Sequence, residues 1–181
     1  RSHYFIKGST MKKLLLIIAI VFAGFALKQI YLANLTDDVS LYGENNNAVD
    51  LFDLSDPRIH IVYFGFTRCP DVCPTSLAML SGAFNQIDDT TLSQFRSIFI
   101  TLDPERDSPD HSAEYAHYFH KKIEGSSGSL QAVNMLTERY GVTFHKTELK
   151  DSALEYTIDH SSYFYFLTPD GTLITKVPHT V

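Results

Sequence analysis

The sequence predicts an α/β protein with a layered sheet, because short apolar strands alternate along it with amphipathic helices. Its 181 residues, of which 44% are hydrophobic, suit one domain with accessory segments and exclude a disordered chain. Two cysteines are too few for a disulfide scaffold or a four-cysteine zinc site, although they can form one reactive pair. We therefore expect one α/β domain whose metal or redox chemistry is concentrated at that pair.

The N-terminal segment has the pattern of an export signal or a membrane anchor. Two lysines, Lys12 and Lys13, precede an apolar run at residues 14–27, and a shorter apolar stretch follows soon after. The first run has the length of the apolar part of a signal peptide, and both stretches together approach the length of a spanning helix. The run has no polar face, which argues against a buried amphipathic helix.

We expect residues 11–34 to act as an uncleaved signal anchor, with a cleaved signal peptide as the alternative. The lysines at its start favour the cytoplasmic side, so the chain that follows is expected on the periplasmic side of the membrane. Residues 1–10 are interpreted as an upstream segment outside the fold, and residues 35–181 as the folded domain.

The remainder of the chain is strongly acidic. Residues 1–28 carry five of the 15 basic residues and none of the 21 acidic ones, which leaves a net charge of −11 for the rest. Phosphate contacts to nucleic acid require clustered lysine and arginine. We therefore expect no nucleic-acid partner.

The first elements of the domain are a hairpin, a strand and a helix. A turn rich in glycine and asparagine predicts a hairpin with strands at residues 39–42 and 49–54. The β-branched and aromatic run at 59–66 predicts a buried central strand. Apolar residues at helical spacing predict a helix from about 74 to 87, with Pro74 in its first turn.

The later elements continue the alternation of strands and helices that predicts a layered sheet. In order they are a buried strand at 95–102, a polar loop at 103–109, a helix to about residue 120, a flexible Gly/Ser loop at 125–128, a helix at 130–140 ended by Gly141, a strand at 142–147, and a closing hairpin of 163–167 with 172–176.

The two cysteines lie where a predicted strand passes into a predicted helix. Cys69 and Cys73 are four residues apart, in the sequence Cys-Pro-Asp-Val-Cys-Pro. Amides at the start of a helix stabilise a thiolate, and Arg68 adds a positive neighbour. Two converging thiolates can close a disulfide or bind a soft metal ion, and their spacing is one residue longer than that of the CxxC redox pair. A metal site and a redox site both remain open at this point.

A metal site with two sulfur ligands needs a further ligand. Zinc is normally held by four ligands, whereas thiolate selects Cu(I) and imidazole suits either oxidation state of copper. Among the eight histidines, His160 stands out because it lies in the loop just before the closing hairpin, and in a thioredoxin-like sheet that loop lies next to the cysteine turn. A third ligand and a surface histidine are both consistent with its spacing alone.

Three segments together resemble the Sco/SenC family. They are FGFTRCPDVCPT, which ends at Thr75, LDPERDSP from Leu102 to Pro109, and Asp-His-Ser at 159–161. The motifs occur in the order found in the family, and the resemblance covers about residues 39–181. It implies a membrane-anchored copper-binding protein with a thioredoxin-like, three-layer fold that helps to assemble the CuA centre of cytochrome c oxidase.

The resemblance also implies roles for single residues. Cys69 and Cys73 correspond to the copper thiolates and the redox-active pair, and His160 corresponds to the imidazole ligand. Asp103, in the DPERD segment, is expected near the site, behind the ligands or in docking a partner. Asp159 is expected to orient His160, as carboxylates behind a metal ligand do. The alternative for both carboxylates is a cap on a loop or turn.

Two features depart from the family pattern. Arg68 stands where the family often has histidine or tyrosine, so its positive charge is expected to favour the thiolate and to influence the choice of partner. The sequence ends at Val181, whereas family members usually continue into a helix that covers the sheet. That C-terminal helix is therefore expected to be missing.

We expect a copper chaperone without turnover, which receives copper from a donor chaperone and supplies it to the CuA-bearing subunit of cytochrome c oxidase. The alternative is a thiol–disulfide reductase that keeps the CuA cysteines reduced and is itself served by a thiol reductant. A copper or redox sensor with a membrane partner, and a peroxidase, are further alternatives. His160 separates the first two functions, because thiol exchange requires no imidazole ligand.

Overall fold

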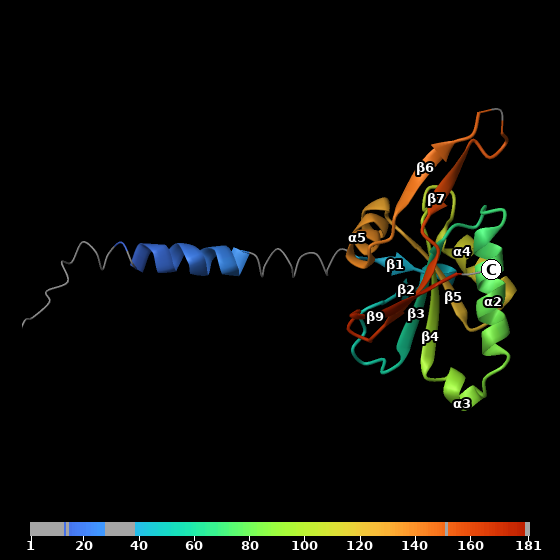
Figure 1. The fold of residues 1–181 in the computed structure, drawn as a ribbon, viewed down its shortest axis with the longest axis horizontal. Helices are drawn as coiled ribbons and strands as arrows, with labels where there is room; N and C mark the ends of the chain where they lie inside the picture. Colours follow the sequence, from blue (N-terminus) through green and yellow to red (C-terminus); the bar gives the residue numbers. More distant parts are fainter. Residues whose placement is uncertain (1–12, 14, 28–38, 151, 180–181) are drawn as a thin grey trace, which may run out of the picture. The chain divides into compact units, whose positions relative to one another are not determined.

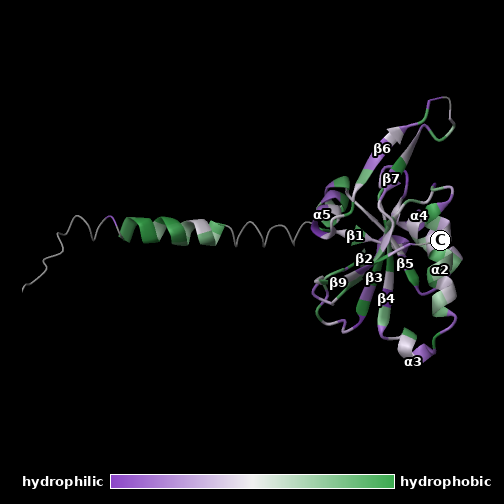
Figure 2. Cartoon of the chain, in the orientation of Figure 1, coloured by the Kyte–Doolittle hydropathy of each residue, from purple (hydrophilic) through white to green (hydrophobic). Residues whose placement is uncertain are grey.

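The computed structural model describes residues 13, 15–27, 39–150 and 152–179. Residues 15–27 form a helix that is predominantly hydrophobic (Figure 2). No helix among the described residues is both long and apolar enough to cross a membrane. The upstream segment at 1–10 and part of the expected anchor at 11–34 lie outside the described residues.

The chain divides into two compact units, Arg1–Asp38 and Val39–Val181. The second unit is a mixed α/β fold with a seven-stranded sheet in the order β2-β1-β5-β4-β3-β8-β9 and a separate ribbon of β6 and β7 (Figure 1). The strands are β1 Leu41–Tyr42, β2 Ala48–Val49, β3 Ile59–Gly65, β4 Phe95–Thr101, β5 Ile123–Gly128, β6 Phe144–Glu148, β7 Tyr156–His160, β8 Tyr163–Leu167 and β9 Leu173–Pro178.

Helices cover both faces of the sheet. Helix α4 packs against both β5 and α2, and Figure 1 shows α5 on the opposite side of the sheet from α2 and α4. Since β3, β4 and β5 are parallel neighbours, the crossovers through α2 and α4 place both helices on one face. The helices are α2 Val72–Phe84, α3 Asp89–Leu92, α4 Pro109–Phe119 and α5 Leu130–Tyr140, with a 3-10 turn at Glu44–Asn46.

The centre of the core is the parallel pair β3–β4. Val62, Ile98 and Phe99 are fully buried. This confirms the prediction from the continuous apolar runs, which are typical of strands covered on both faces. Gly141 ends α5 as predicted, in the left-handed conformation with φ 64°. At the start of α4, the Ser108 hydroxyl accepts a hydrogen bond from the backbone N–H of His111.

The glycine- and serine-rich segment at 125–128 is a buried strand, and the prediction of a flexible loop there was wrong. β5 lies between β4 and β1, with α4 packed across it. A Cβ atom on Gly125 would lie 1.9 Å from the Ser112 carbonyl oxygen of α4. The small residues therefore reflect a close approach of backbone to backbone, although their composition is that of a loop.

Strand β7 was also not predicted, since the sequence placed its residues in a loop. It pairs antiparallel with β6, so that Phe144 lies opposite His160 and Glu148 lies opposite Tyr156. His160 is thus the last residue of a strand. Other differences are smaller: the second strand of the first hairpin is shorter than predicted, and α2 begins at Val72 rather than at Pro74.

Candidate metal centre

The turn between β3 and α2 places the two cysteines at different depths. Cys69 is half-buried in the turn, and Cys73, the second residue of α2, is fully buried. The backbone N–H of Cys73 donates a hydrogen bond to Cys69 Sγ at 3.4 Å. The first amides of a helix have no partner within the helix, so the Cys69 sulfur occupies the position of a capping group.

Gly65, the last residue of β3, makes room for the buried sulfur. A Cβ atom at this position would lie 2.9 Å from Cys73 Sγ and 3.0 Å from the rings of Phe99 and Tyr63. A glycine inside a buried strand often marks such an approach. The strand therefore carries a glycine where the thiol of Cys73 packs against it.

The imidazole of His160 joins the two sulfurs from β7. Its Nε2 lies 3.4 Å from Cys73 Sγ, and its Nδ1 lies 3.2 Å from the carbonyl oxygen of Ser161. Because a carbonyl oxygen only accepts, Nδ1 donates this bond, and Nε2 is the ring nitrogen that faces the sulfurs. The three ligand atoms, from Cys69, Cys73 and His160, all lie within 4.8 Å of one another.

Aromatic side chains wall the histidine. Phe66 meets the His160 ring edge to face, with centroids 6.0 Å apart, and Tyr63 does so at 6.4 Å. Both aromatic residues are almost fully buried. Tyr63 Oη also shares a hydrogen bond of 3.2 Å with Ser162 Oγ, which fixes the turn that follows His160. The imidazole is thus held by packing as well as by hydrogen bonding.

The two thiols differ in acidity. The hydrogen bond from the Cys73 thiol lowers the pKa of Cys69 to about 4, against the opposing effect of burial, and the His160 side chain and the amide of Cys73 add to the lowering. Donating that hydrogen bond, together with burial, raises the pKa of the Cys73 thiol far above its usual range. Without a metal ion, Cys69 is therefore the thiolate and Cys73 remains the thiol.

This donor set fits copper. Ligand atoms of one ion lie about 3.5–4 Å apart when metal–ligand bonds are about 2.0–2.3 Å long. The observed separations, none above 4.8 Å, require only a small contraction. Two soft thiolates and one imidazole suit copper, whereas structural zinc prefers four ligands. The donor atoms of Cys69, Cys73 and His160 therefore fit a copper ion.

Asp103 is buried but contacts the β6–β7 ribbon rather than the ligand atoms. Tyr156 Oη donates a hydrogen bond to Asp103 Oδ1 at 2.8 Å, and Arg106 forms a salt bridge with the other carboxylate oxygen. The structure therefore places Asp103 behind the strand that carries the histidine, without direct contact to the cysteines.

Asp159 lies on the opposite face of β7 from His160, because neighbouring side chains alternate along a strand. Its carboxylate accepts a hydrogen bond of 2.6 Å from Thr147 Oγ1 and lies 3.2 Å from His145 Nε2. The carbonyl of Ser161 is the partner of the imidazole instead. Arg68, the other expected neighbour of the thiolates, is exposed.

Sequence reasoning missed two supports of the site, Gly65 and the Ser161 carbonyl. The first left a signal, because a lone glycine inside the apolar run at 59–66 indicates that another group packs closely. The second left none, since a backbone carbonyl is common to every residue. Its orientation depends on how the chain turns between β7 and β8.

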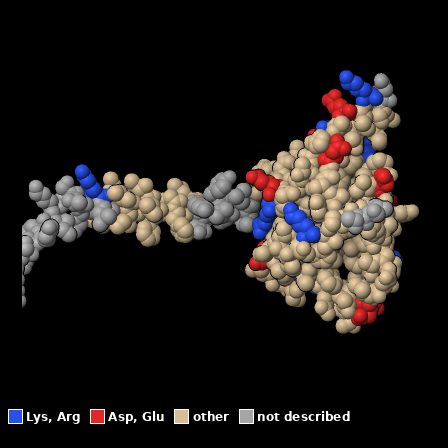
Figure 3. All heavy atoms as spheres, viewed as in Figure 1, with Lys and Arg blue, Asp and Glu red and all other residues tan. Residues whose placement is uncertain are grey.

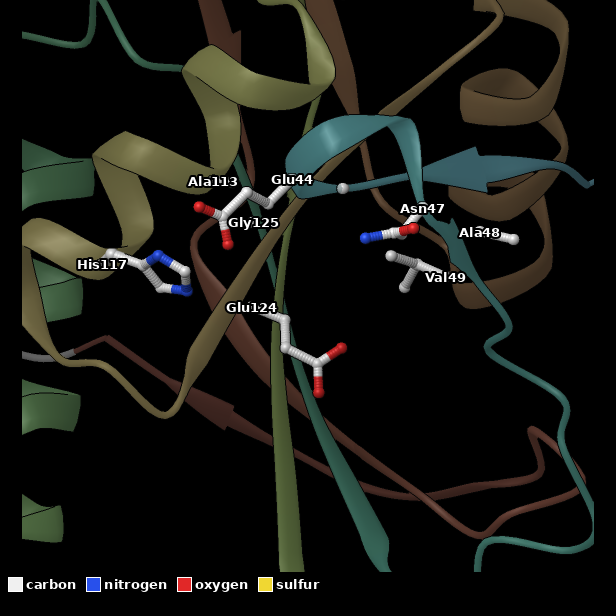
Figure 4. A pocket seen from close by; sticks show the side chains of 9 residues that line it. Glu44, Asn47, Ala48, Val49, Ala113, His117, Glu124 and Gly125 are labelled. Carbon is white, nitrogen blue, oxygen red and sulfur yellow. The ribbon is translucent and has the colours of Figure 1, made fainter.

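A further pocket, between the first hairpin and α4, also contains acidic and histidine side chains but does not bring three ligand atoms together. Glu44, His117 and Glu124 line it (Figure 4). Among the residues that the structure describes, only the two cysteines and His160 bring three such ligand atoms within 4.8 Å. On the face seen in Figure 3, charges of both signs are scattered and form no broad patch of one sign.

Comparison with known proteins places this site in context. The sequence model described as SCO1/SenC matches residues 29–181. The protein sco1 of Schizosaccharomyces pombe is 37% identical over 118 residues, which cover 65% of this chain and 45% of that protein. A SCO2-like protein of Rickettsia conorii is 31% identical over 149 residues, which cover 76% of this chain and 72% of that protein. The chain thus spans less than half the length of the yeast relative.

A solved structure gives the same picture of the fold. The crystal structure of Arabidopsis thaliana ScoI with copper bound aligns with a TM-score of 0.69 and 32% sequence identity, over 78% of this chain and 86% of that one. The residues matched by the family model, 29–181, include the two cysteines and the histidine.

Proposed function

The chain belongs to the SCO1/SenC family, and from that membership we propose that it is a copper chaperone for the CuA site of cytochrome c oxidase. The observation that carries the proposal is the meeting of Cys69, Cys73 and His160 within 4.8 Å. A chaperone must bind copper and also release it. Three protein ligands leave the ion open to an incoming ligand from a partner.

Copper passes between proteins by ligand exchange, and the depth of the ligands suits such an exchange. Cys69 is half-buried, whereas Cys73 is fully buried. A receiving thiolate would displace Cys69 first, because that sulfur is accessible from solvent. The donor would be another copper chaperone, and the receiver would be the CuA-bearing subunit of the oxidase.

The proposal includes a location. An oxidase subunit that receives copper outside the cytoplasm requires a chaperone there, and the lysines before the apolar run at 14–27 favour export of the chain that follows. We propose a domain that is tethered to the membrane on its periplasmic side. Labelling of Cys69 in intact cells with a membrane-impermeant thiol reagent tests this location.

A thiol–disulfide reductase is the second candidate, and the unequal thiols favour it. In that reaction the Cys69 thiolate attacks a target disulfide and releases one target thiol. Cys73 then loses its proton, attacks the mixed disulfide and releases the second thiol. The target gains two electrons, and the chain is left with a Cys69–Cys73 disulfide that a thiol reductant must reopen.

One experiment separates the two functions. The CuA-bearing domain of an oxidase subunit is offered with its cysteines either reduced or joined as a disulfide. A chaperone transfers Cu(I) to the reduced target, and His160→Ala loses this transfer. A reductase opens the oxidised target without copper, and His160→Ala retains that reaction. Copper transfer that is independent of His160 would contradict the chaperone proposal.

A further inference from the structure

One short loop contacts both segments that carry the proposed copper ligands, the cysteine turn and the β6–β7 ribbon. Residues 103–107 follow β4, and the loop is folded tightly on itself: the N–H groups of Arg106 and Asp107 donate to the Asp103 carbonyl at 3.1 and 2.9 Å. Thr101 Oγ1 accepts a hydrogen bond of 3.0 Å from the Asp103 amide and donates one of 2.6 Å to Asp107. These bonds make the loop a rigid extension of β4.

The first contact of the loop is with the segment that carries the cysteines. Asp107 is fully buried, and its carboxylate accepts hydrogen bonds from the amide of Thr67 at 2.9 Å and from the Thr67 hydroxyl at 2.6 Å. Thr67 precedes Cys69 by two residues. Ser127 of β5 donates a further bond of 2.7 Å to the Asp107 carbonyl. The start of the cysteine turn is thereby tied to the sheet.

The second contact is with the β6–β7 ribbon that carries the histidine. Tyr156 Oη donates to Asp103 at 2.8 Å, and burial together with that bond raises the pKa of Tyr156 to about 12, so the phenol remains a donor. The Arg106 guanidinium lies 3.4 Å from the centre of the Tyr156 ring and donates to the carbonyls of Leu154 at 2.9 Å and Tyr156 at 3.2 Å.

The geometry of the ribbon explains why this contact reaches His160. Tyr156 and His160 are the two ends of β7, which places them about 13 Å apart at about 3.3 Å per residue. Next to the His160 end, Ser161 donates to the Thr143 carbonyl at 2.9 Å and accepts from the Thr143 amide at 3.2 Å. A ribbon held at both ends cannot swing about one of them.

We propose that the loop at 103–107 is a bracket that sets the distance between the cysteines and His160. Asp107 holds the cysteine side through Thr67, and Asp103 and Arg106 hold the histidine side through Tyr156. A metal site tolerates errors of only about 0.5 Å in the placement of its ligands, which a loose ribbon would exceed. The proposal rests on the assigned copper ligands, and these three residues are positioning residues.

The bracket is tested in the full chain with Tyr156→Phe, which removes the bond to Asp103 and keeps the ring, and with Asp103→Asn. Affinity for Cu(I) is measured anaerobically against a competing chelator. We expect both variants to bind copper about tenfold more weakly, the size of effect typical for partners behind a metal ligand. Glu148→Gln is the matched control, since this exposed residue lies opposite Tyr156 on the ribbon.

A double-mutant cycle shows whether the bracket acts through the histidine. In a His160→Ala background, Tyr156→Phe is expected to cause no further loss of copper affinity. Full additivity of the two losses would overturn the proposal, because the tyrosine would then act through general stability. Affinity of Tyr156→Phe equal to that of the control would overturn it as well.

Hydrogen exchange of the copper-free chain tests the bracket apart from the ligand assignment. In Tyr156→Phe the amides of Thr157 and Asp159, which face β6 in this register, are expected to exchange faster, while those of β3 and β4 remain protected as in the control. Unchanged exchange in β7 contradicts the bracket. If exchange rises but His160→Ala binds copper normally, the ligand assignment has failed and the bracket has not.

Discussion

The two cysteines share one site but not one chemical state. Cys69 sits in the turn and accepts a hydrogen bond from the first turn of α2, whereas Cys73 is sealed behind it against Gly65. We therefore expect the accessible sulfur to be the nucleophile and, in the proposed copper transfer, the first ligand to exchange. The buried Cys73 thiol loses its proton only when its sulfur binds a metal ion or forms a disulfide.

The rate of alkylation should report this difference. The pKa of Cys69 is lowered to about 4, so its thiolate persists as the pH falls and is lost only near pH 4. In the reduced, copper-free protein, iodoacetamide should modify Cys69 at a rate that is nearly constant from pH 8 down to about pH 5, whereas a free thiol slows below its pKa of about 8.5. Mass spectrometry of the labelled peptide measures the rate, and a decline that begins at pH 8 would contradict the assignment.

Gly65 should be intolerant of a single added methyl group. In Gly65→Ala the new Cβ would meet Cys73 Sγ at 2.9 Å and two buried rings at 3.0 Å. We expect a loss of about 1–3 kcal/mol in the free energy of unfolding, as for other overpacked cores, together with weaker copper binding. Denaturant unfolding and copper titration measure the two effects. Gly82→Ala, where nothing lies within 4 Å of the new atom, is the control.

At the scale of elements, the sequence predicted those whose cause is local. The apolar runs of β3 and β4 and the glycine that ends α5 are each visible within a few residues. β5 and β7 were missed because their causes are distant in the sequence. Gly125 of β5 is required by the close approach of the α4 backbone, and Tyr156 at the start of β7 is held by a hydrogen bond to the loop after β4.

The close approach of β5 to the backbone of α4 predicts that Gly125→Ala destabilises the domain. A methyl group there would lie 1.9 Å from the Ser112 carbonyl oxygen, so α4 must move away from the sheet. We expect the free energy of unfolding, measured by denaturant unfolding, to fall by about 3 kcal/mol, the upper end of the range typical of overpacked cores. Stability equal to that of the Gly82→Ala control would show that the segment does not need its glycine.

At the scale of the whole molecule, the site joins segments that are far apart in the sequence. The cysteine pair was predicted from a local motif, whereas His160 lies 87 residues from Cys73 and was assigned through resemblance to a family. Its partner, the Ser161 carbonyl, depends on the path of the chain after β7. Asp159 was expected to orient the imidazole because it is next to His160 in the sequence. Neighbouring side chains alternate along a strand, however, so the Asp159 carboxylate points to the opposite face of β7, toward Thr147 and His145.

Because the ligands come from segments joined only by folding, copper should stabilise the whole domain. A ligand that binds only the folded state adds about 2.7 kcal/mol when its free concentration is 100 times Kd. Thermal unfolding of the reduced protein should therefore shift to higher temperature with Cu(I), and the shift should shrink in His160→Ala. An equal shift in both proteins would mean that copper is held by the cysteines alone.

The most direct measurement is an anaerobic Cu(I) titration of the reduced full chain against a competing chelator, with His160→Ala and His145→Ala in parallel. His145 lies on the same ribbon, exposed and on the face opposite to His160, so it controls for loss of an imidazole. We predict one copper ion per chain. Copper affinity should be unchanged in His145→Ala. In His160→Ala it should fall by more than about 10–100-fold, which is the loss typical when a residue behind a metal ligand is removed. Equal affinity of the wild type and His160→Ala would contradict the ligand set on which the account depends.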